Sequence, residues 1–205
     1  MAEPSLWMQK VAQNPGHSTW YIERFRAMAR AGDDLDGEAR LVDAMAPRAA
    51  HILDAGCGPG RVGGYLAAAG HRVVGVDVDP ALIAAAEQDH PGPRWLVGDL
   101  AELDLPARGI TEPFDLIVAA GNVMPFLAPS TRVEVLRRFR RHLAADGRAV
   151  VGFGAGRGYG FDEFLDDVSA AGLRPDLLLS TWDLRPFTAD SDFLVAVLRP
   201  DGRER

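Results

Sequence analysis

The chain has only one cysteine, Cys57, among its 205 residues. A single cysteine excludes a disulfide within the chain and leaves no cluster of thiols for zinc, so we expect a reducing compartment and no metal site. The sequence also lacks an apolar run long enough to cross a bilayer, and its first residues lack the basic start and apolar stretch of a signal peptide. These absences favour a cytoplasmic protein with no membrane partner.

Positive charge is scarce as well. Lysine and arginine total 22 against 29 aspartate and glutamate residues, which gives a net charge of −7. Because such a chain repels a phosphate backbone, nucleic acid is not expected as a partner. Apolar residues make up 47% and charged residues 25%, the balance of a folded globular domain. We therefore expect a monomer or homodimer that acts on a small molecule.

From residue 50 onward, strand patterns and helix patterns alternate. Strands are predicted at 52–55, 72–77, 94–97, 114–119 and 148–153. Helices are predicted at 61–69, at 81–89 and from a capping box at Thr131 up to residue 146. A further helix from Phe161 to Gly172 precedes two strands, 177–184 and 193–198, which have no helix between them. This order predicts an α/β fold: a doubly wound, mostly parallel seven-stranded sheet with an antiparallel C-terminal edge hairpin.

The N-terminal part has no strand-like alternation. Apolar side chains between residues 5 and 46 recur at helical spacing, with breaks at 14–16 and 32–34, and Ser18 is a plausible cap of the second helix. A third helix is predicted at 37–45. We expect residues 1–48 to form a helical cap within the same domain, residues 49–199 to form the α/β domain, and residues 200–205 to be a disordered tail.

A glycine-rich turn, Asp-Ala-Gly-Cys-Gly-Pro-Gly, follows the first predicted strand at residues 54–60. Glycine at positions 56, 58 and 60 can adopt backbone angles that side chains forbid, so the chain can turn sharply and let a ligand contact its main chain. A helix begins directly afterwards, and its N-terminal amides face the same place. The motif predicts a cofactor loop, with a purely structural turn as the alternative.

Three aspartates follow three of the predicted strands. In a doubly wound sheet the ligand lies beyond these strand ends. Asp77 suits the ribose hydroxyls of any nucleotide. Asp54 and Asp99 favour a ligand with ammonium and amino groups, because further carboxylates would repel a pyrophosphate. Arg61 stands where a dinucleotide loop has its third glycine. Each aspartate alone is also a common helix or turn cap.

In combination these segments resemble the class I S-adenosylmethionine-dependent methyltransferases. The resemblance lies in residues 53–60, in Val-Gly-Val-Asp at 74–77, in Gly-Asp at 98–99 and in the strand from 114. It covers about residues 50–199 and implies S-adenosylmethionine as cofactor, S-adenosylhomocysteine as product and in-line methyl transfer. The cofactor contacts that we expect are Tyr21, Arg24, Asp54, Gly56, Cys57, Gly58, Gly60, Asp77, Val78, Asp99, Leu100, Gly121 and Asn122, of which Tyr21 and Arg24 lie outside the resemblance.

The resemblance implies a role for four of these residues. The acid matching Asp77 holds the ribose hydroxyls, the residue matching Val78 packs on adenine, and the acid matching Asp99 meets the adenine amino group. Asp54 is similar to the acid that reaches the ammonium group of the methionine portion. Arg24, one helical turn after Tyr21, is a hypothetical ligand of the methionine carboxylate.

The sequence defines the methyl acceptor and a general base less clearly than the cofactor site. The sequence offers no unambiguous general base, so the catalytic residue is unknown. Cys57 is expected to be a small residue chosen for fit rather than a nucleophile. Most histidines and the arginines of the helix at 131–146 are expected to be solvated. Acceptor contacts are expected from Trp7, His17, Trp20, Arg157, Tyr159, Trp182 and Arg185. Two alternatives stay open: an NAD(P)-dependent oxidoreductase and a non-catalytic S-adenosylmethionine-binding regulatory protein.

Overall fold

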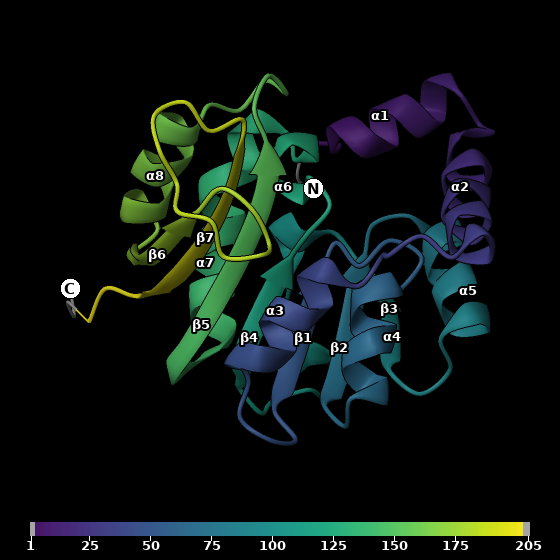
Figure 1. The fold of residues 1–205 in the computed structure, drawn as a ribbon, viewed down its shortest axis with the longest axis horizontal. Coiled ribbons are helices and arrows are strands. Elements are labelled where there is room, and N and C mark those ends of the chain that lie inside the picture. Colours follow the sequence, from purple (N-terminus) through teal and green to yellow (C-terminus); the bar gives the residue numbers. More distant parts are fainter. Residues whose placement is uncertain (1–2, 203–205) are drawn as a thin grey trace.

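The computed structural model describes residues 3–202, which build one seven-stranded sheet with helices on both faces (Figure 1). The strands are β1 His51–Ala55, β2 Arg72–Asp77, β3 Arg94–Val97, β4 Phe114–Ala119, β5 Leu143–Gly154, β6 Leu173–Leu179 and β7 Phe193–Pro200. Their order across the sheet is β3-β2-β1-β4-β5-β7-β6. Only β7 runs antiparallel to its neighbours, because it inserts between β5 and β6. The predicted doubly wound sheet with its edge hairpin is confirmed.

Three helices precede β1, and the other helices lie between the strands along the chain. They are α1 Leu6–Gln13, α2 His17–Ala31, α3 Gly37–Met45, α4 Arg61–Ala68, α5 Pro80–Asp89, α6 Val123–Phe126, α7 Arg132–His142 and α8 Phe161–Ala170. In Figure 1, α3 lies on one face of the sheet, whereas α1 and α2 stand beyond the ends to which the strand arrows point. Within residues 3–202 no helix is long and apolar enough to cross a membrane. The division of the chain at residues 48 and 199 stays a prediction.

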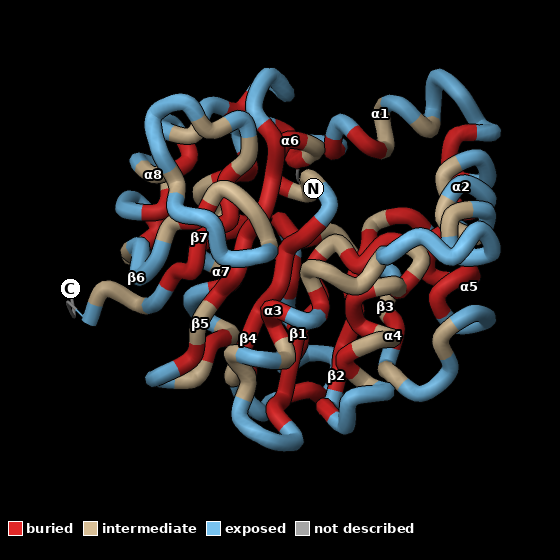
Figure 2. Tube along the Cα trace, viewed as in Figure 1, coloured by how far each residue is buried: buried red, intermediate tan, exposed pale blue. Residues whose placement is uncertain are grey.

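The central strands are buried on both faces, which explains their nearly continuous apolar sequences. Successive side chains of a strand point to opposite faces. Ile52 of β1 therefore packs with Val42 and Leu66 of α3 and α4. Leu53 belongs to the buried cluster on the other face, which also contains Phe139 of α7 and Phe164 of α8. Figure 2 shows the resulting buried layer along the middle of the sheet.

Two predicted helix caps are wrong. Helix α2 begins at His17 after Gly16, and Ser18 lies inside it, where its hydroxyl donates to a carboxylate of another element. Helix α2 therefore begins directly after the Asn-Pro-Gly turn and before the position that the Ser18 cap indicated. The Thr131 hydroxyl donates to the carbonyl of Ala128 instead of capping α7. In both cases the hydroxyl donates to a group outside the helix and makes no cap hydrogen bond.

Several boundaries near the C-terminus also differ. Helix α7 ends at His142 and β5 begins directly after it, because the chain pairs with β4 sooner than predicted. Strand β6 covers residues 173–179 rather than 177–184 and contains an irregularity beside Pro175. The predicted tail is ordered at its start, since the Asp201 amide donates to the Gly172 carbonyl. Residues 203–205 of that tail lie outside the described residues.

Candidate functional site

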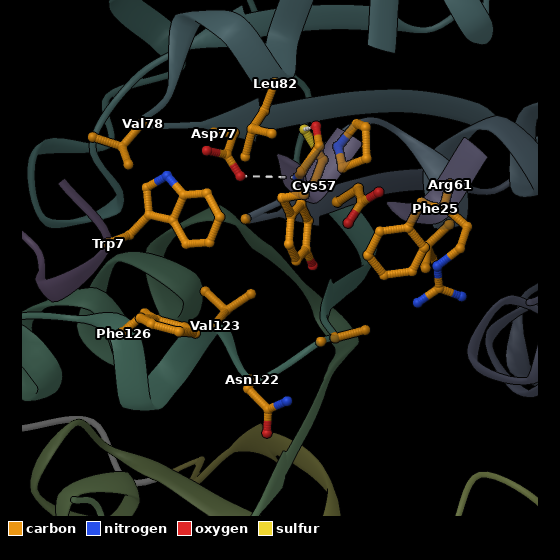
Figure 3. A pocket seen from close by; sticks show the side chains of 18 of the residues that line it. Trp7, Phe25, Cys57, Arg61, Asp77, Val78, Leu82, Asn122, Val123 and Phe126 are labelled. Atoms are coloured by element: carbon orange, nitrogen blue, oxygen red, sulfur yellow. Dashed lines mark hydrogen bonds between the residues drawn. The ribbon is translucent and has the colours of Figure 1, made fainter. Parts of the chain in front are cut away.

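A cavity of about 540 Å³ lies beyond the C-terminal ends of β1, β2 and β4 (Figure 3). The sheet forms its floor, and α1, α2 and α6 form its walls. The predicted cofactor residues that line it are Tyr21, Arg24, Asp54, Gly56, Cys57, Gly58, Asp77, Val78, Asp99, Leu100, Gly121 and Asn122. Gly60 is the exception. It faces the core, where a Cβ would lie 2.8 Å from Ala86 and 3.0 Å from Trp95.

The glycine loop folds tightly over the end of β2. The amides of Gly56 and Cys57 both donate to the carbonyl of Val76. Gly56 has a φ of +77°, and a Cβ there would lie 2.5 Å from Val123. Both the backbone angle and the close approach of α6 therefore require glycine. Burial raises the pKa of the Cys57 thiol well above its usual value, which disfavours the thiolate that a nucleophile needs.

Asp77 ends β2 and holds the loop in place. One carboxylate oxygen accepts from the Gly58 amide and the other from the Asp79 amide, each at 2.9 Å. Burial raises the Asp77 pKa to about 6, although these two amides act in the opposite direction. Each oxygen keeps a further lone pair for a ligand hydroxyl. A ribose-type diol would thus meet a carboxylate that is already oriented.

Asp54 is the most deeply buried of the three acids, with 2% of its surface exposed. It accepts from the Gly63 amide in the first turn of α4 at 2.8 Å. Burial raises its pKa to about 7, and the Gly63 amide and the Arg61 charge lower it. Arg61 itself pairs with Glu38 of α3 through two contacts of 2.6 and 2.7 Å. An additional cation beside Asp54 would therefore favour its ionised form.

The opposite side of the cavity combines a carboxylate with apolar side chains. Asp99 caps the short helix Leu100–Glu102 by accepting from the Ala101 amide at 2.8 Å. Val78 packs with Trp7 and Leu82, and Leu100 is buried below. The expected capping role of Asp99 and a ligand role are compatible, because its side chain also lines the cavity. A flat heterocycle with an amino group suits this surface.

Asn122 joins the ends of β4 and β5. It adopts a left-handed conformation with a φ of +67°, and its side-chain oxygen accepts from the Gly154 amide at 2.8 Å. In Figure 3 the Asn122 side chain points away from Asp77. The backbone at Gly121 and Asn122 is thus the part presented toward the loop.

Asp79 anchors the N-terminal helices to the rest of the site. Its carboxylate accepts from the Trp7 indole N–H at 2.9 Å, from the Ser18 hydroxyl at 2.5 Å and from the Ala81 amide at 2.9 Å. Only 3% of its surface is exposed. One buried carboxylate therefore connects α1, α2 and α5, a function that the predicted helix cap alone did not indicate.

One face of α2 forms much of the cavity wall. His17, Tyr21, Arg24, Phe25 and Met28 share this face and line the cavity. His17 is 8% exposed, and its ring lies between those of Trp7 and Trp20. Burial lowers the pKa of His17, so its imidazole is neutral at pH 7. His17 thus lines the cavity, where it was expected among the acceptor contacts.

Three expected acceptor contacts lie elsewhere. Tyr159 is buried in the core, where its hydroxyl donates to Asp167 at 2.6 Å and the Arg132 guanidinium lies 3.8 Å from its ring centroid. Trp182 packs on β5 at Gly152, and Arg185 is exposed beside Asp183. A glycine-rich loop suggested exposure, but Tyr159 is enclosed by Phe153 of β5, Phe164 of α8 and Arg132 of α7.

The expectation of solvated histidines is also wrong for two of them. His51 is buried, stacks on Phe114 and contacts the Pro113 carbonyl. His71 is buried beside Asp43. Conversely, sequence reasoning overlooked Lys10 and Val123 as cavity residues. Lys10 follows Trp7 by three positions, so their shared helix face was the available signal.

Comparison with known proteins places this arrangement in a family. A family model described as a methyltransferase domain matches residues 52–147. The crystal structure of a TehB-like S-adenosylmethionine-dependent methyltransferase from Corynebacterium glutamicum is 55% identical, with a TM-score of 0.86, over 91% of this chain and 100% of that one. The chain belongs to the S-adenosylmethionine-dependent methyltransferases. S-Adenosylmethionine is the cofactor of this family.

Two curated relatives match over shorter segments. A malonyl-[acyl-carrier protein] O-methyltransferase from Pectobacterium atrosepticum is 33% identical over 47% of this chain and 37% of its own length. A trans-aconitate 2-methyltransferase from Delftia acidovorans is 31% identical over 48% of this chain and 45% of its own length. The match therefore spans less than half of either curated relative.

Proposed function

We propose that this methyltransferase transfers a methyl group from S-adenosylmethionine to a small-molecule acceptor bound under α1 and α2. The main support is one cavity whose floor carries three strand-end carboxylates and whose walls carry aromatic side chains. Its volume of about 540 Å³ falls in the range of small-ligand pockets. The relatives named for malonyl-[acyl-carrier protein], trans-aconitate and 18S rRNA represent different acceptor classes. The proposal therefore rests on the cavity and not on their substrates.

The residues of the floor fit the cofactor chemically. Asp77 would hold the ribose hydroxyls, Asp99 the adenine amino group and Asp54 the ammonium group, because each is an acceptor on a separate strand end. Val78 and Leu100 would lie against adenine. The remaining contacts in this proposal are Tyr21, Arg24, Gly56, Cys57, Gly58, Gly121 and Asn122, with Arg24 as the ligand of the carboxylate.

When bound, S-adenosylmethionine supplies a methyl group activated by its positively charged sulfur. The chain contributes mainly by positioning the cofactor and the acceptor. The loop and α6 define one side of the reacting space, and Trp7 and Phe126 exclude water from it. Such orientation accounts for roughly 7 to 11 kcal/mol of barrier lowering in favourable cases. His17, a neutral imidazole in the wall, is placed to accept a proton if the acceptor releases one.

Calorimetric titration of the full chain with S-adenosylhomocysteine and with NAD⁺ tests the cofactor. We expect S-adenosylhomocysteine alone to bind. Binding of NAD⁺ without S-adenosylhomocysteine would favour the oxidoreductase alternative. Methyl transfer from labelled S-adenosylmethionine to a broad panel of small molecules tests the reaction, and tight cofactor binding with no product across the panel would favour the regulatory alternative.

A further inference from the structure

The imidazole of His17 has no hydrogen-bond partner in the protein. Only 8% of the surface of His17 is exposed, yet within residues 3–202 neither ring nitrogen takes part in a hydrogen bond. His51, His71 and His142 differ, because each of their rings contacts a polar atom of the chain. Buried polar groups are nearly always hydrogen-bonded. An unpartnered imidazole in the wall of a cavity therefore indicates a contact with a ligand.

Two neighbouring aromatic rings hold this imidazole in the cavity wall. The centroid of the His17 ring lies 4.9 Å from that of Trp7 and 5.4 Å from that of Trp20, and all three residues line the cavity. Nδ1 of His71 is enclosed in the core without a partner, whereas both nitrogens of His17 keep accessible surface. The ring of His17 is thus fixed by packing, and its nitrogens stay open to a hydrogen-bond donor in the cavity.

His17 also lies close to the side chains that border the reacting space. The ring of its neighbour Trp7 is 5.2 Å from that of Tyr21 and 5.6 Å from that of Phe126, between centroids. The Tyr21 ring is 3.8 Å from a Cβ position on Gly58 of the loop, and Phe126 is the last residue of α6. Only the ring of Trp7 therefore separates His17 from Tyr21 and Phe126. A small acceptor can reach both His17 and the space between the loop and α6.

The charge state of the imidazole defines the chemistry that it can support. Burial and the charge of Lys10 lower the pKa of His17, whereas the charge of Asp79 raises it. The neutral ring is a weak base, so it suits the hydroxyl of an aromatic ring, whose pKa is about 10, better than the far less acidic hydroxyl of an aliphatic alcohol. An amine attacks through its lone pair before it loses a proton, and a carboxylate has no proton to lose. A neutral buried base thus favours a phenol as acceptor.

We propose that His17 is the general base of the reaction and that the methyl acceptor is a phenol, an inference that rests on the proposed function. The phenol oxygen forms the new bond to the methyl carbon, and the bond between this carbon and the cofactor sulfur breaks with its electron pair left on sulfur. The phenol proton passes to a ring nitrogen of His17, which then releases it to water. Trp7, Phe126 and the half-exposed Trp20 contact the flat ring of the acceptor.

Calorimetry on the full chain saturated with S-adenosylhomocysteine tests the contact with the hydroxyl. Phenol itself is compared with anisole, its methyl ether, which has no proton to donate. We expect phenol to bind about two- to tenfold more tightly, the range for one hydrogen bond. His17→Phe keeps a ring between Trp7 and Trp20 and should abolish this preference. His17→Gln should retain it, because the amide oxygen accepts a hydrogen bond.

Methyl transfer from labelled S-adenosylmethionine to a panel of phenols and the matching anilines tests the base. We expect product from the phenols alone. Both His17→Phe and His17→Gln should lower the rate by about 100-fold, because neither side chain takes up a proton. His17→Gln thus separates hydrogen bonding from proton transfer. The control His90→Gln, at a histidine outside the cavity lining, should react as the parent chain does.

Cofactor affinity separates the possible failures. Both His17 variants should bind S-adenosylhomocysteine as the parent chain does, which also shows that they fold. Equal binding of phenol and anisole, or a phenol preference that survives in His17→Phe, overturns the inference about His17 alone. Product from anilines instead of phenols, no product from either class, or a parent-like rate in His17→Gln overturns it too. Failure of the parent chain to bind S-adenosylhomocysteine contradicts the proposed function itself.

Discussion

The two ends of the cavity are built in different ways. At the floor, Asp54 and Asp77 are located by parallel pairing of β1 with β2 and β4. The register of the sheet therefore fixes their separation. At the wall, α1 and α2 are located by side-chain packing and by one buried carboxylate, that of Asp79. The floor is a rigid frame, whereas the wall depends on a few contacts between distant segments.

This difference assigns separate tasks to the two ends. A floor fixed by backbone hydrogen bonds suits a ligand that is the same in every turnover, because its carboxylates stay oriented without it. The floor also contains two acids whose pKa values are raised by burial, an unfavourable arrangement until a ligand with donors binds. A wall made of helices can change its side chains without moving the sheet. We therefore expect specificity for the acceptor to reside in the wall.

The largest predicted effect concerns the rigidity of the floor. Gly56→Ala combines a left-handed backbone, which costs roughly 1–2 kcal/mol, with a clash that costs roughly 1–3 kcal/mol. Gly121 has a similar φ of +76° but open space beside it. We therefore expect denaturant unfolding to show a loss of about 3 kcal/mol for Gly56→Ala and only about 1 kcal/mol for Gly121→Ala.

A rescue variant sharpens this comparison. Because the clash is with Val123, Val123→Ala in the Gly56→Ala background should recover part of the lost stability. Equal losses for the two glycine variants, or the absence of any rescue, would show that contact between the loop and α6 is not what demands glycine.

The next prediction concerns the ligand contact of the floor. Asp77→Asn keeps the size of the side chain but loses its charge, so ribose hydroxyls lose a charged acceptor. We expect calorimetry to show about 100-fold weaker binding of S-adenosylhomocysteine, since such hydrogen bonds contribute about 1.5–3 kcal/mol. Asp146→Asn, at an exposed position of β5, is the matched control. Unchanged affinity in Asp77→Asn would remove the ribose assignment.

The floor was predictable from the sequence because its geometry follows from local patterns. A strand of known length followed by an acid puts that acid at the edge of the sheet, as for Asp54 and Asp77. The wall was less predictable. Trp7 and Asp79 are 72 positions apart, and no local pattern indicates that they meet. The sheet contains one contact that was equally hard to predict. A Cβ on Gly75 of β2 would lie 2.2 Å from Trp95, and no local pattern indicates that these two residues meet.

Errors in the prediction have one physical origin. Tyr159 and His51 occur beside glycine-rich or polar segments, which normally lie at the surface. Both are buried because aromatic side chains from other elements pack on them, and each has a polar partner there. Ser18 and Thr131 fit a local capping pattern, yet a tertiary or loop acceptor takes each hydroxyl. Local patterns describe the chain well until distant partners compete for the same group.

The third prediction uses pH to separate ligand binding from stability. The pKa values of Asp54 and Asp77 are about 7 and about 6 in the folded chain. An ammonium group and hydroxyl donors favour the ionised acids, so S-adenosylhomocysteine should bind more weakly as the pH falls below 7. The limiting slope is about tenfold per pH unit for each proton taken up. Calorimetry between pH 8 and 5.5 measures how the affinity for S-adenosylhomocysteine changes with pH.

The stability of the free protein should change in the opposite direction. An unfolded aspartate ionises near pH 3.8, whereas folded Asp54 keeps its proton until about pH 7. As the pH rises through this window the unfolded chain loses the proton first, so Asp54 lowers the free energy of unfolding. Asp54→Asn should make both the affinity for S-adenosylhomocysteine and the free energy of unfolding less dependent on pH. A parent chain whose cofactor affinity is constant between pH 8 and 5.5 would contradict the raised pKa values.

The smallest predicted effect concerns the attachment of the wall. Trp7→Phe keeps an aromatic ring but removes the N–H that donates to Asp79, and Ser18→Ala removes the other side-chain donor to the same oxygen. We expect each change to lower stability by about 1 kcal/mol, since two donors remain for the carboxylate in either variant. Hydrogen exchange should accelerate in α1 and α2 while β1 and β4 keep their protection. The double variant should lose more than the sum, because it leaves only the Ala81 amide for a buried charge. If exchange rose equally in the sheet, floor and wall would be one cooperative unit, and the separation of their tasks would fail.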